Sequence, residues 1–82
     1  MLVEDKIKRA MEEAMDCQSV TVDSDGRHYA LKIISDEFEG MKTLQRQQKV
    51  YVVLSDFITD GSVHAVTIKA LTVEEAKTQE GS

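Results

Sequence analysis

The sequence contains no tryptophan, no proline and only one cysteine, Cys17. A single cysteine cannot form an internal disulfide, so the chain lacks the covalent staple of small secreted domains, and a reducing compartment is its simplest setting. One cysteine and two histidines also fall short of the four ligands of an ordinary zinc site. The domain therefore depends on its hydrophobic core, or a partner chain completes a site on it.

Long hydrophobic runs are missing as well, since no apolar run approaches the roughly 20 residues that span a bilayer. Glu4 and Asp5 place acids where a signal or transit peptide is basic or poor in acids. We therefore expect a protein that is cytoplasmic or already processed, without membrane association. The formal net charge of −5 opposes general affinity for phosphate backbones, so a nucleic-acid role would require a local basic patch.

The first half of the chain predicts a helix followed by a hairpin. Residues 3–15 have the apolar spacing of an amphipathic helix. Residues 20–22 and 28–34 alternate as strands on either side of a turn cluster at 23–26, in which Gly26 can take a positive φ. The short connection indicates an antiparallel hairpin, and the side chains expected on one face of its second strand are Tyr29, Leu31 and Ile33.

The second half begins with a long helix. It is predicted over residues 41–59, with Gly40 at its N-cap and Gly61 just beyond its C-terminal end. Its buried stripe is expected to comprise Leu44, Val50, Val53, Leu54 and Phe57. Residues 63–70 then alternate as a third strand.

A short last helix completes the chain, because Thr72 and Glu75 have the spacing of a capping box. The element order is therefore α-β-β-α-β-α. The second strand, the long helix and the third strand form a crossover unit, so these two strands are expected to run parallel. We predict an α+β fold with a three-stranded mixed sheet and helices packed on one face.

Four segments of the chain resemble the BolA family, and most closely its short bacterial IbaG-like branch. They are Phe38-Glu39-Gly40, Leu44-Gln45-Arg46-Gln47 with Val50, Val63 to Ala70, and Thr72-Val73-Glu74-Glu75. The resemblance covers nearly the whole chain and implies a type II KH-like fold, with a BolA-like domain at 1–78 and a flexible tail at 79–82. Ala76 departs from the pattern, because the family commonly has tryptophan there, and the difference concerns the packing of the C-terminal segment.

The resemblance implies a non-enzymatic adaptor that partners a monothiol glutaredoxin. The two proteins share a [2Fe–2S] cluster, for which the glutaredoxin and glutathione supply thiolates. By resemblance, the other two ligands are His64, in the His-Ala strand, and His28, at the position of the family's loop ligand. Imidazole ligation raises the potential of such a cluster and makes it sensitive to pH. The isolated chain is expected to carry no cofactor and to be a monomer or a weak homodimer.

Plainer interpretations remain open for these residues. His64 shares its parity with Val66 and Ile68, which is typical of a partly buried histidine at the edge of a core. His28 fits an exposed histidine at the end of a turn, and Cys17 fits a small incidental or buried residue. No pairing of a nucleophile with a base suggests an enzyme.

A basic helix face supplies the second hypothesis. Lys42, Arg46 and Lys49 follow the i, i+4, i+7 spacing, and with Phe38 and Gly40 they form the candidate partner or nucleic-acid surface, expected near His64. It is either an ordinary solvated face, a docking surface for an acidic partner or the glutathione carboxylates, or a phosphate track. The phosphate track would make the protein a KH-like nucleic-acid-binding regulator in stress response. The absence of a GXXG loop and of a run of exposed aromatic residues disfavours that alternative.

Overall fold

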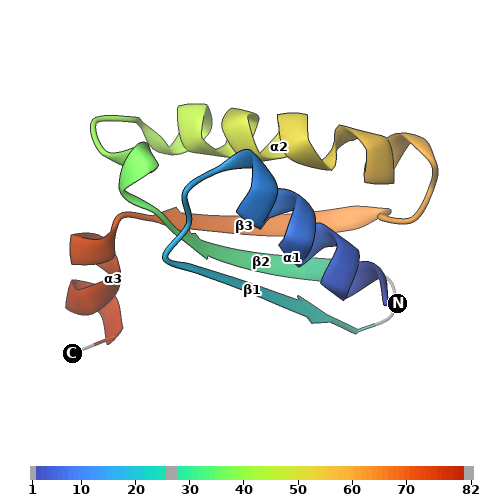
Figure 1. Cartoon of the computed structure of the whole chain (residues 1–82), viewed down its shortest axis with the longest axis horizontal. Coiled ribbons are helices and arrows are strands. Elements are labelled where there is room, and N and C mark those ends of the chain that lie inside the picture. The colour runs from blue at the N-terminus through green and yellow to red at the C-terminus, as the bar shows by residue number, and fades with distance from the viewer. Residues whose placement is uncertain (1, 26–27, 81–82) are drawn as a thin grey trace.

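The computed structural model describes residues 2–25 and 28–80, which form one mixed sheet with helices against it (Figure 1). The elements in chain order are α1 (Val3–Ala14), β1 (Ser19–Ser24), β2 (His28–Ile34), the 3₁₀ helix η1 (Asp36–Phe38), α2 (Thr43–Thr59), β3 (Ala65–Leu71) and α3 (Val73–Glu80). This order and the mixed sheet confirm the predicted fold class. Among the described residues, no helix is long and apolar enough to cross a membrane.

The sheet has β2 at its centre, in the order β1-β2-β3 within the described part of the chain. β1 pairs antiparallel with β2, with Ser19 opposite Ile34, and β2 pairs parallel with β3, with His28 opposite Ala65. Both pairings match the prediction. Because β2 and β3 are parallel and in register, the residues at their starts lie side by side at one end of the sheet.

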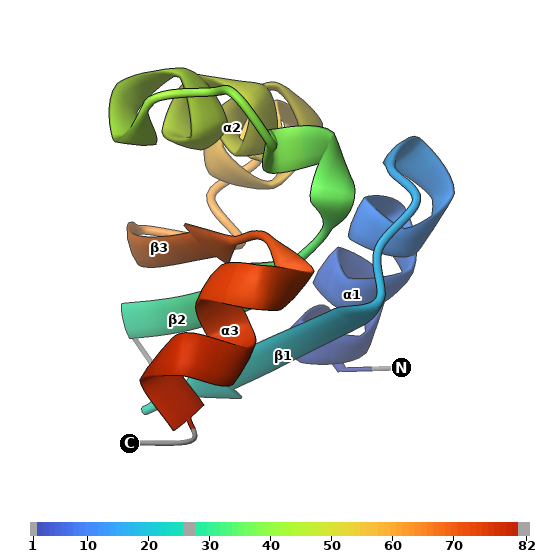
Figure 2. The same ribbon diagram turned by 90° about the vertical axis from the view of Figure 1, so that its left-hand side faces the viewer.

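One face of the sheet carries the hydrophobic core. The helices α1 and α2 pack over this face, while α3 lies at the end of the sheet where β3 finishes (Figures 1 and 2). Tyr29, Leu31 and Ile33 point into the core, as their alternation predicts. They meet fully buried side chains from the helices and the 3₁₀ turn, including Ile7, Met11, Phe38, Val50 and Leu54. Burying each such large side chain contributes about 1.5–3 kcal/mol of transfer free energy.

The start of α2 differs from the prediction. The N-cap is Lys42 and not Gly40, and the N–H of Lys42 donates to Oε1 of Gln45 at 3.0 Å. Gly40 instead has φ of 80° in the turn before the helix, a conformation that an L-residue adopts only with strain. Leu44 was expected in the core but is 65% exposed. At about 100° per residue it lies roughly 120° round the helix from the buried Val50.

The C-terminal signals are confirmed. Gly61 follows the C-cap of α2 and has φ of 82°. The N–H of Thr72 donates to Oε1 of Glu75 at 2.8 Å, and the N–H of Glu75 donates to Oγ1 of Thr72 at 3.2 Å, which completes the capping box of α3. Ala76 is buried at 4% exposure. The helix continues through Glu80, and residues 81–82 lie outside the described residues, as do Gly26 and Arg27 in the turn.

Candidate functional site

Arg46, the centre of the expected basic surface, is turned into the protein. Its side chain is 12% exposed. Nε donates to the carbonyl of Met41 at 2.9 Å, and Nη1 donates to the carbonyl of Ala70 at 3.1 Å. The two terminal nitrogens also donate to the carboxylate of Glu75, Nη1 to Oε1 at 2.6 Å and Nη2 to Oε2 at 3.3 Å. Arg46 therefore joins α2, the end of β3 and the start of α3, and the prediction that it forms part of a docking surface is wrong.

The same contacts control the ionisation of Glu75. The hydrogen bond from Arg46 and the backbone hydrogen bond from Thr72 lower the pKa of Glu75 to about 2. The carboxylate therefore stays ionised throughout the physiological range. The carboxylate accepts hydrogen bonds from the N–H of Thr72 and from the guanidinium of Arg46. Glu75 therefore has a structural role.

The other residues of the expected surface differ in their exposure to solvent. Lys49 is 40% exposed and lies 3.8 Å from the carboxylate of Glu37. Phe38 is fully buried in the core, so it is not a surface residue. Lys42 and Gly40 are exposed at the turn before α2. The five residues together therefore do not form a continuous basic patch.

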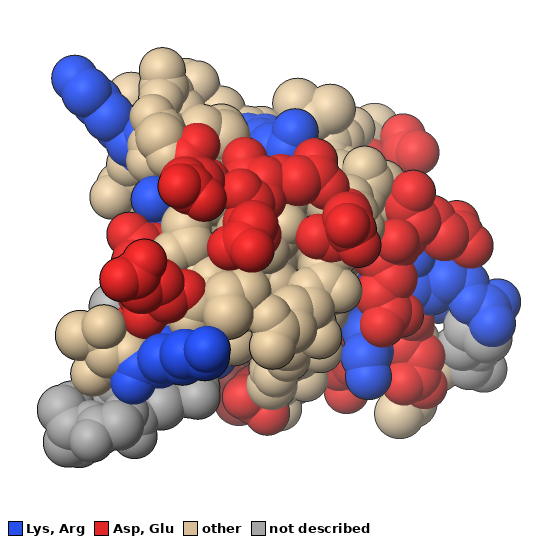
Figure 3. All heavy atoms as spheres, turned by 60° about the vertical axis from the view of Figure 1, so that its left-hand side comes forward, with Lys and Arg blue, Asp and Glu red and all other residues tan. Residues whose placement is uncertain are grey.

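The surface near that turn is acidic. A hollow of about 950 Å³ lies between η1, the turn and α3, and its lining includes Asp36, Glu39, Glu74 and Glu75 with Arg46 and Lys77. Figure 3 shows acidic side chains gathered over this end of the molecule. An acidic surface repels phosphate, so this end gives no support to the nucleic-acid alternative.

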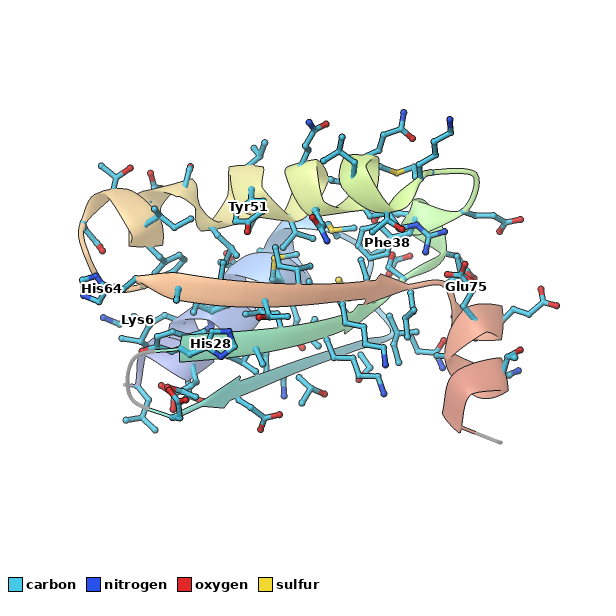
Figure 4. All side chains as sticks on the ribbon, turned by 180° about the vertical axis from the view of Figure 1, so that it is seen from behind. Lys6, His28, Phe38, Tyr51, His64 and Glu75 are labelled. Carbon is cyan, nitrogen blue, oxygen red and sulfur yellow. The ribbon has the colours of Figure 1, made fainter. Side chains whose placement is uncertain are left out.

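The histidines lie at the opposite end of the molecule. Figure 4 shows His28 and His64 towards one end of the sheet, and Phe38 and Glu75 towards the other. His64 follows the C-terminal end of α2, whereas Lys42 is the N-cap of this helix and Arg46 lies near its start. The 17 residues of this helix span roughly 25 Å at about 1.5 Å per residue. The expectation that the basic face lies near His64 is therefore wrong.

His64 is exposed, directly before β3. The preceding residue, Val63, is 2% exposed in the core, and its N–H donates to the carbonyl of Phe57 at 3.1 Å. This anchor fixes the backbone while the next side chain faces solvent. The alternative of a partly buried histidine at the core edge is thus wrong, and the imidazole is accessible to a partner or a metal.

His28 is half-buried and begins β2. Its N–H donates to Oδ1 of Asp25 at 2.8 Å, which fixes the backbone on one side of the turn. Its ring Nε2 lies 2.7 Å from Oγ1 of Thr67 on the neighbouring strand. When Nε2 carries the proton and donates to Thr67, the lone pair of Nδ1 is left for a metal.

Thr67 is a contact that the sequence alone did not reveal. It pairs in register with Ala30, two residues beyond His28. Successive even-numbered side chains share one face of β2, and the parallel register places Thr67 on that same face. Only this register relates the two residues, which are 39 positions apart.

Lys6 and Asp60 lie at the histidine end. Hydrogen bonding from Ser62, whose N–H donates to Oδ1 of Asp60 at 2.8 Å, lowers the pKa of Asp60. The positive charge of Lys6, which belongs to α1 and lies at this end (Figure 4), contributes less to the same shift. These contacts order the connection from α2 to β3, which carries His64.

The part of the chain that the structure describes holds no complete metal site. Within residues 2–25 and 28–80, no group of three or more histidine, cysteine or acidic side chains could hold a metal ion. Cys17 lies after α1, and burial, with Glu37 as the next cause, raises the pKa of its thiol. A thiol of raised pKa is a poor nucleophile and ligand at neutral pH. The histidine pair is therefore the candidate site.

Comparison with known proteins gives a consistent result. The family model described as BolA-like protein matches residues 3–75. The acid stress protein IbaG of Escherichia coli strain K12 is 37% identical over 70 residues, which cover 85% of this chain and 83% of that protein. The BolA domain of SufE1 from Arabidopsis thaliana has 27% identity and a TM-score of 0.82, covering 88% of this chain and 93% of that one. The solution structure of BolA1 from Mus musculus has 28% identity and a TM-score of 0.79, covering 98% and 72%.

Proposed function

The chain belongs to the BolA-like protein family, and on this basis we propose that it is a non-enzymatic adaptor that pairs with a monothiol glutaredoxin and shares a [2Fe–2S] cluster in iron–sulfur cluster assembly or trafficking. The observation that carries the proposal is the position of His28 and His64. Both lie at the starts of paired parallel strands, at one end of the sheet and within reach of solvent.

The chemistry of the two side chains suits this role. Neutral imidazoles are ligands for iron in mixed histidine–thiolate clusters, and they leave the other iron positions for thiolates from a partner. His64 follows the hydrogen-bonded Val63 and has an exposed side chain, whereas the ring of His28 contacts Thr67. A cluster bound there would supply one-electron chemistry. The chain would supply two nitrogen ligands, and the glutaredoxin would dock at the end of the sheet that carries them.

The relatives add a biological setting to the proposal. One of them, in Escherichia coli, carries the name acid stress protein, and it is 37% identical to this chain. We infer that the present chain also acts in a stress response, and that the shared cluster is the functional group in this role. A cytoplasmic setting agrees with the need for free glutathione and reduced thiols.

The proposal is tested by co-expression with a monothiol glutaredoxin and measurement of the visible absorption spectrum of the purified complex. We expect the His64→Ala variant to lose the spectrum of the mixed complex or to release its cluster much faster, because one ligand is gone. The His64→Cys variant should keep a cluster with an altered spectrum, because a thiolate replaces the imidazole. If His64→Ala leaves both the spectrum and the cluster lifetime unchanged, the proposed ligation is wrong.

A control separates ligand loss from misfolding. Lys69 is exposed on β3, like His64 just before it, but lies further along the strand. We expect Lys69→Ala to leave the spectrum of the complex intact. The isolated His64→Ala chain should unfold at the same urea concentration as the wild type, because the side chain it removes is exposed.

A further inference from the structure

The outward side of α2 carries most of the large exposed hydrophobic residues of the described chain. Leu44 is 65% exposed, Val52 73%, Ile58 43% and Tyr51 40%. Figures 1 and 2 show α2 along one border of the molecule, and no other drawn element of the described residues lies outside it. Such a patch on a small soluble domain indicates an interaction surface.

This side of the helix is also free of charge. We define the outer face of α2 as Leu44, Gln45, Gln48, Tyr51, Val52, Ser55, Ile58 and Thr59, all of them exposed. None of the eight is charged, although 30% of the residues in the chain are charged. The charged residues of α2 lie elsewhere on the helix: Arg46 is turned inward, and Lys49 and Asp56 lie along one border of the face.

The spacing of the apolar residues is symmetric. Leu44, Tyr51 and Ile58 are seven residues apart, so they form a nearly straight row along the helix. Tyr51 lies midway between the other two. When two such helices pack antiparallel, Tyr51 meets Tyr51, and each Leu44 meets the Ile58 of the second copy. A two-fold interface requires this kind of self-complementarity.

We propose that a second copy of this chain docks on the outer face of α2, with the two α2 helices antiparallel and Tyr51 at the two-fold axis. The charge of the molecule limits where a second copy can dock. Two chains with a formal charge of −5 repel each other over most of their surfaces. The uncharged outer face is where they can approach with the least repulsion.

The border charges select the antiparallel direction. Lys49 precedes Tyr51 by two residues and Asp56 follows it by five. In the antiparallel pair, Lys49 of one copy and Asp56 of the other therefore lie about 4.5 Å apart along the helix axes. A parallel pair would place Lys49 level with Lys49 and Asp56 level with Asp56. Opposite charges would thus face each other only in the proposed direction.

The interface is small, because one helix from each copy supplies it. Interfaces of this size belong to the low end of specific protein contacts and give weak, concentration-dependent association. In the antiparallel pair the two histidine ends point away from each other, since His64 follows the C-terminal end of each α2. Dimer formation therefore leaves the candidate metal ligands open, and the inference does not depend on the proposed function.

Sedimentation velocity from about 10 µM to 1 mM tests the association. We expect the average mass to rise towards that of a dimer, and to rise further at high salt because salt screens the repulsion between acidic chains. Tyr51→Glu should abolish the rise, because it places two carboxylates at the axis. Leu2→Glu is the matched control: Leu2 is 64% exposed but lies outside α2, so this variant should associate like the wild type.

Disulfide trapping in a Cys17→Ala chain tests the geometry. Tyr51→Cys alone should form a covalent dimer on mild oxidation, and so should the double variant Leu44→Cys with Ile58→Cys. Leu44→Cys alone should not, because the two copies of residue 44 would be roughly 20 Å apart along the axis. A chain that stays monomeric at about 1 mM, or a Leu44→Cys variant that cross-links as readily as Tyr51→Cys, would overturn the proposal.

Discussion

At the scale of single residues, Arg46 shows why a pattern of charges does not identify a surface. Its spacing with Lys42 and Lys49 is that of one basic helix face, and this much is visible in the sequence. Two of its acceptors, the carbonyl of Ala70 and the carboxylate of Glu75, belong to segments more than twenty positions away. No sequence rule for neighbouring residues connects these segments. Only the packed structure therefore shows that Arg46 is a buried, hydrogen-bonded residue and not a docking residue.

Replacing Arg46 with Met should destabilise the domain. The variant keeps the aliphatic packing but removes the charge-assisted hydrogen bonds to the carbonyls of Met41 and Ala70 and to the carboxylate of Glu75. We expect the free energy of unfolding to fall by about 1.5–3 kcal/mol. Urea unfolding measures it, with Lys49→Met as the control, because a half-exposed pair contributes at most about 1 kcal/mol. Equal losses in the two variants would show that Arg46 is an ordinary surface residue.

Glu75 should make the stability depend on pH in acid. Its folded-state pKa is lowered to about 2 from an ordinary value of 4.5. A lowered pKa means that the carboxylate stabilises the fold fully above about pH 5 and progressively less as the pH falls towards 2. Glu75→Gln should therefore destabilise the chain at pH 7, and the difference from the wild type should shrink at low pH.

This prediction is checked by urea unfolding of both chains at several pH values between 7 and 2. Glu74→Gln is the matched control, because Glu74 is the exposed neighbour on the same first turn of α3. A difference between Glu75→Gln and the wild type that stays constant down to pH 2 would contradict the assigned pKa.

At the scale of elements, local sequence rules account for most of the fold. Alternation identified β2 with its observed bounds, and the Thr72–Glu75 pair identified the start of α3. The start of α2 was less visible, because Gly40 has two uses before a helix: an N-cap and a left-handed turn. In the structure Gly40 forms the left-handed turn. Lys42 is the N-cap instead, and its N–H donates to the side chain of Gln45. Leu44 was misplaced because helix periodicity alone cannot distinguish a core stripe from an apolar outer face.

The C-terminal end of α2 gives a prediction at this scale. Gly61 has φ of 82°, and a Cβ added there would meet no atom within 4 Å. Gly61→Ala should therefore destabilise the chain through backbone conformation alone, by about 1–2 kcal/mol. Gly61→Asn should cost less, because asparagine tolerates this conformation better. Thermal unfolding measures both, and an alanine variant as stable as the wild type would refute the assignment of this helix end.

At the scale of the whole molecule, the two ends of the sheet carry different groups of side chains. One end carries the ion pair of Arg46 with Glu75 and an acidic hollow, and the other carries His28 and His64. The sequence resemblance predicted both histidines as ligands. It could not predict that the basic residues at the start of α2 lie far from them. That separation follows from the length of α2, which carries the chain from one end of the molecule to the other.

We propose that His64 and His28 donate nitrogen ligands to a cluster shared with a glutaredoxin. Pulsed EPR of the reduced complex, in which only this chain carries ¹⁵N-labelled histidine, measures this ligation. We expect hyperfine coupling from two histidine nitrogens, of which one disappears in His64→Ala and the other in His28→Ala. A reduced complex whose cluster shows no coupling to labelled histidine would contradict it.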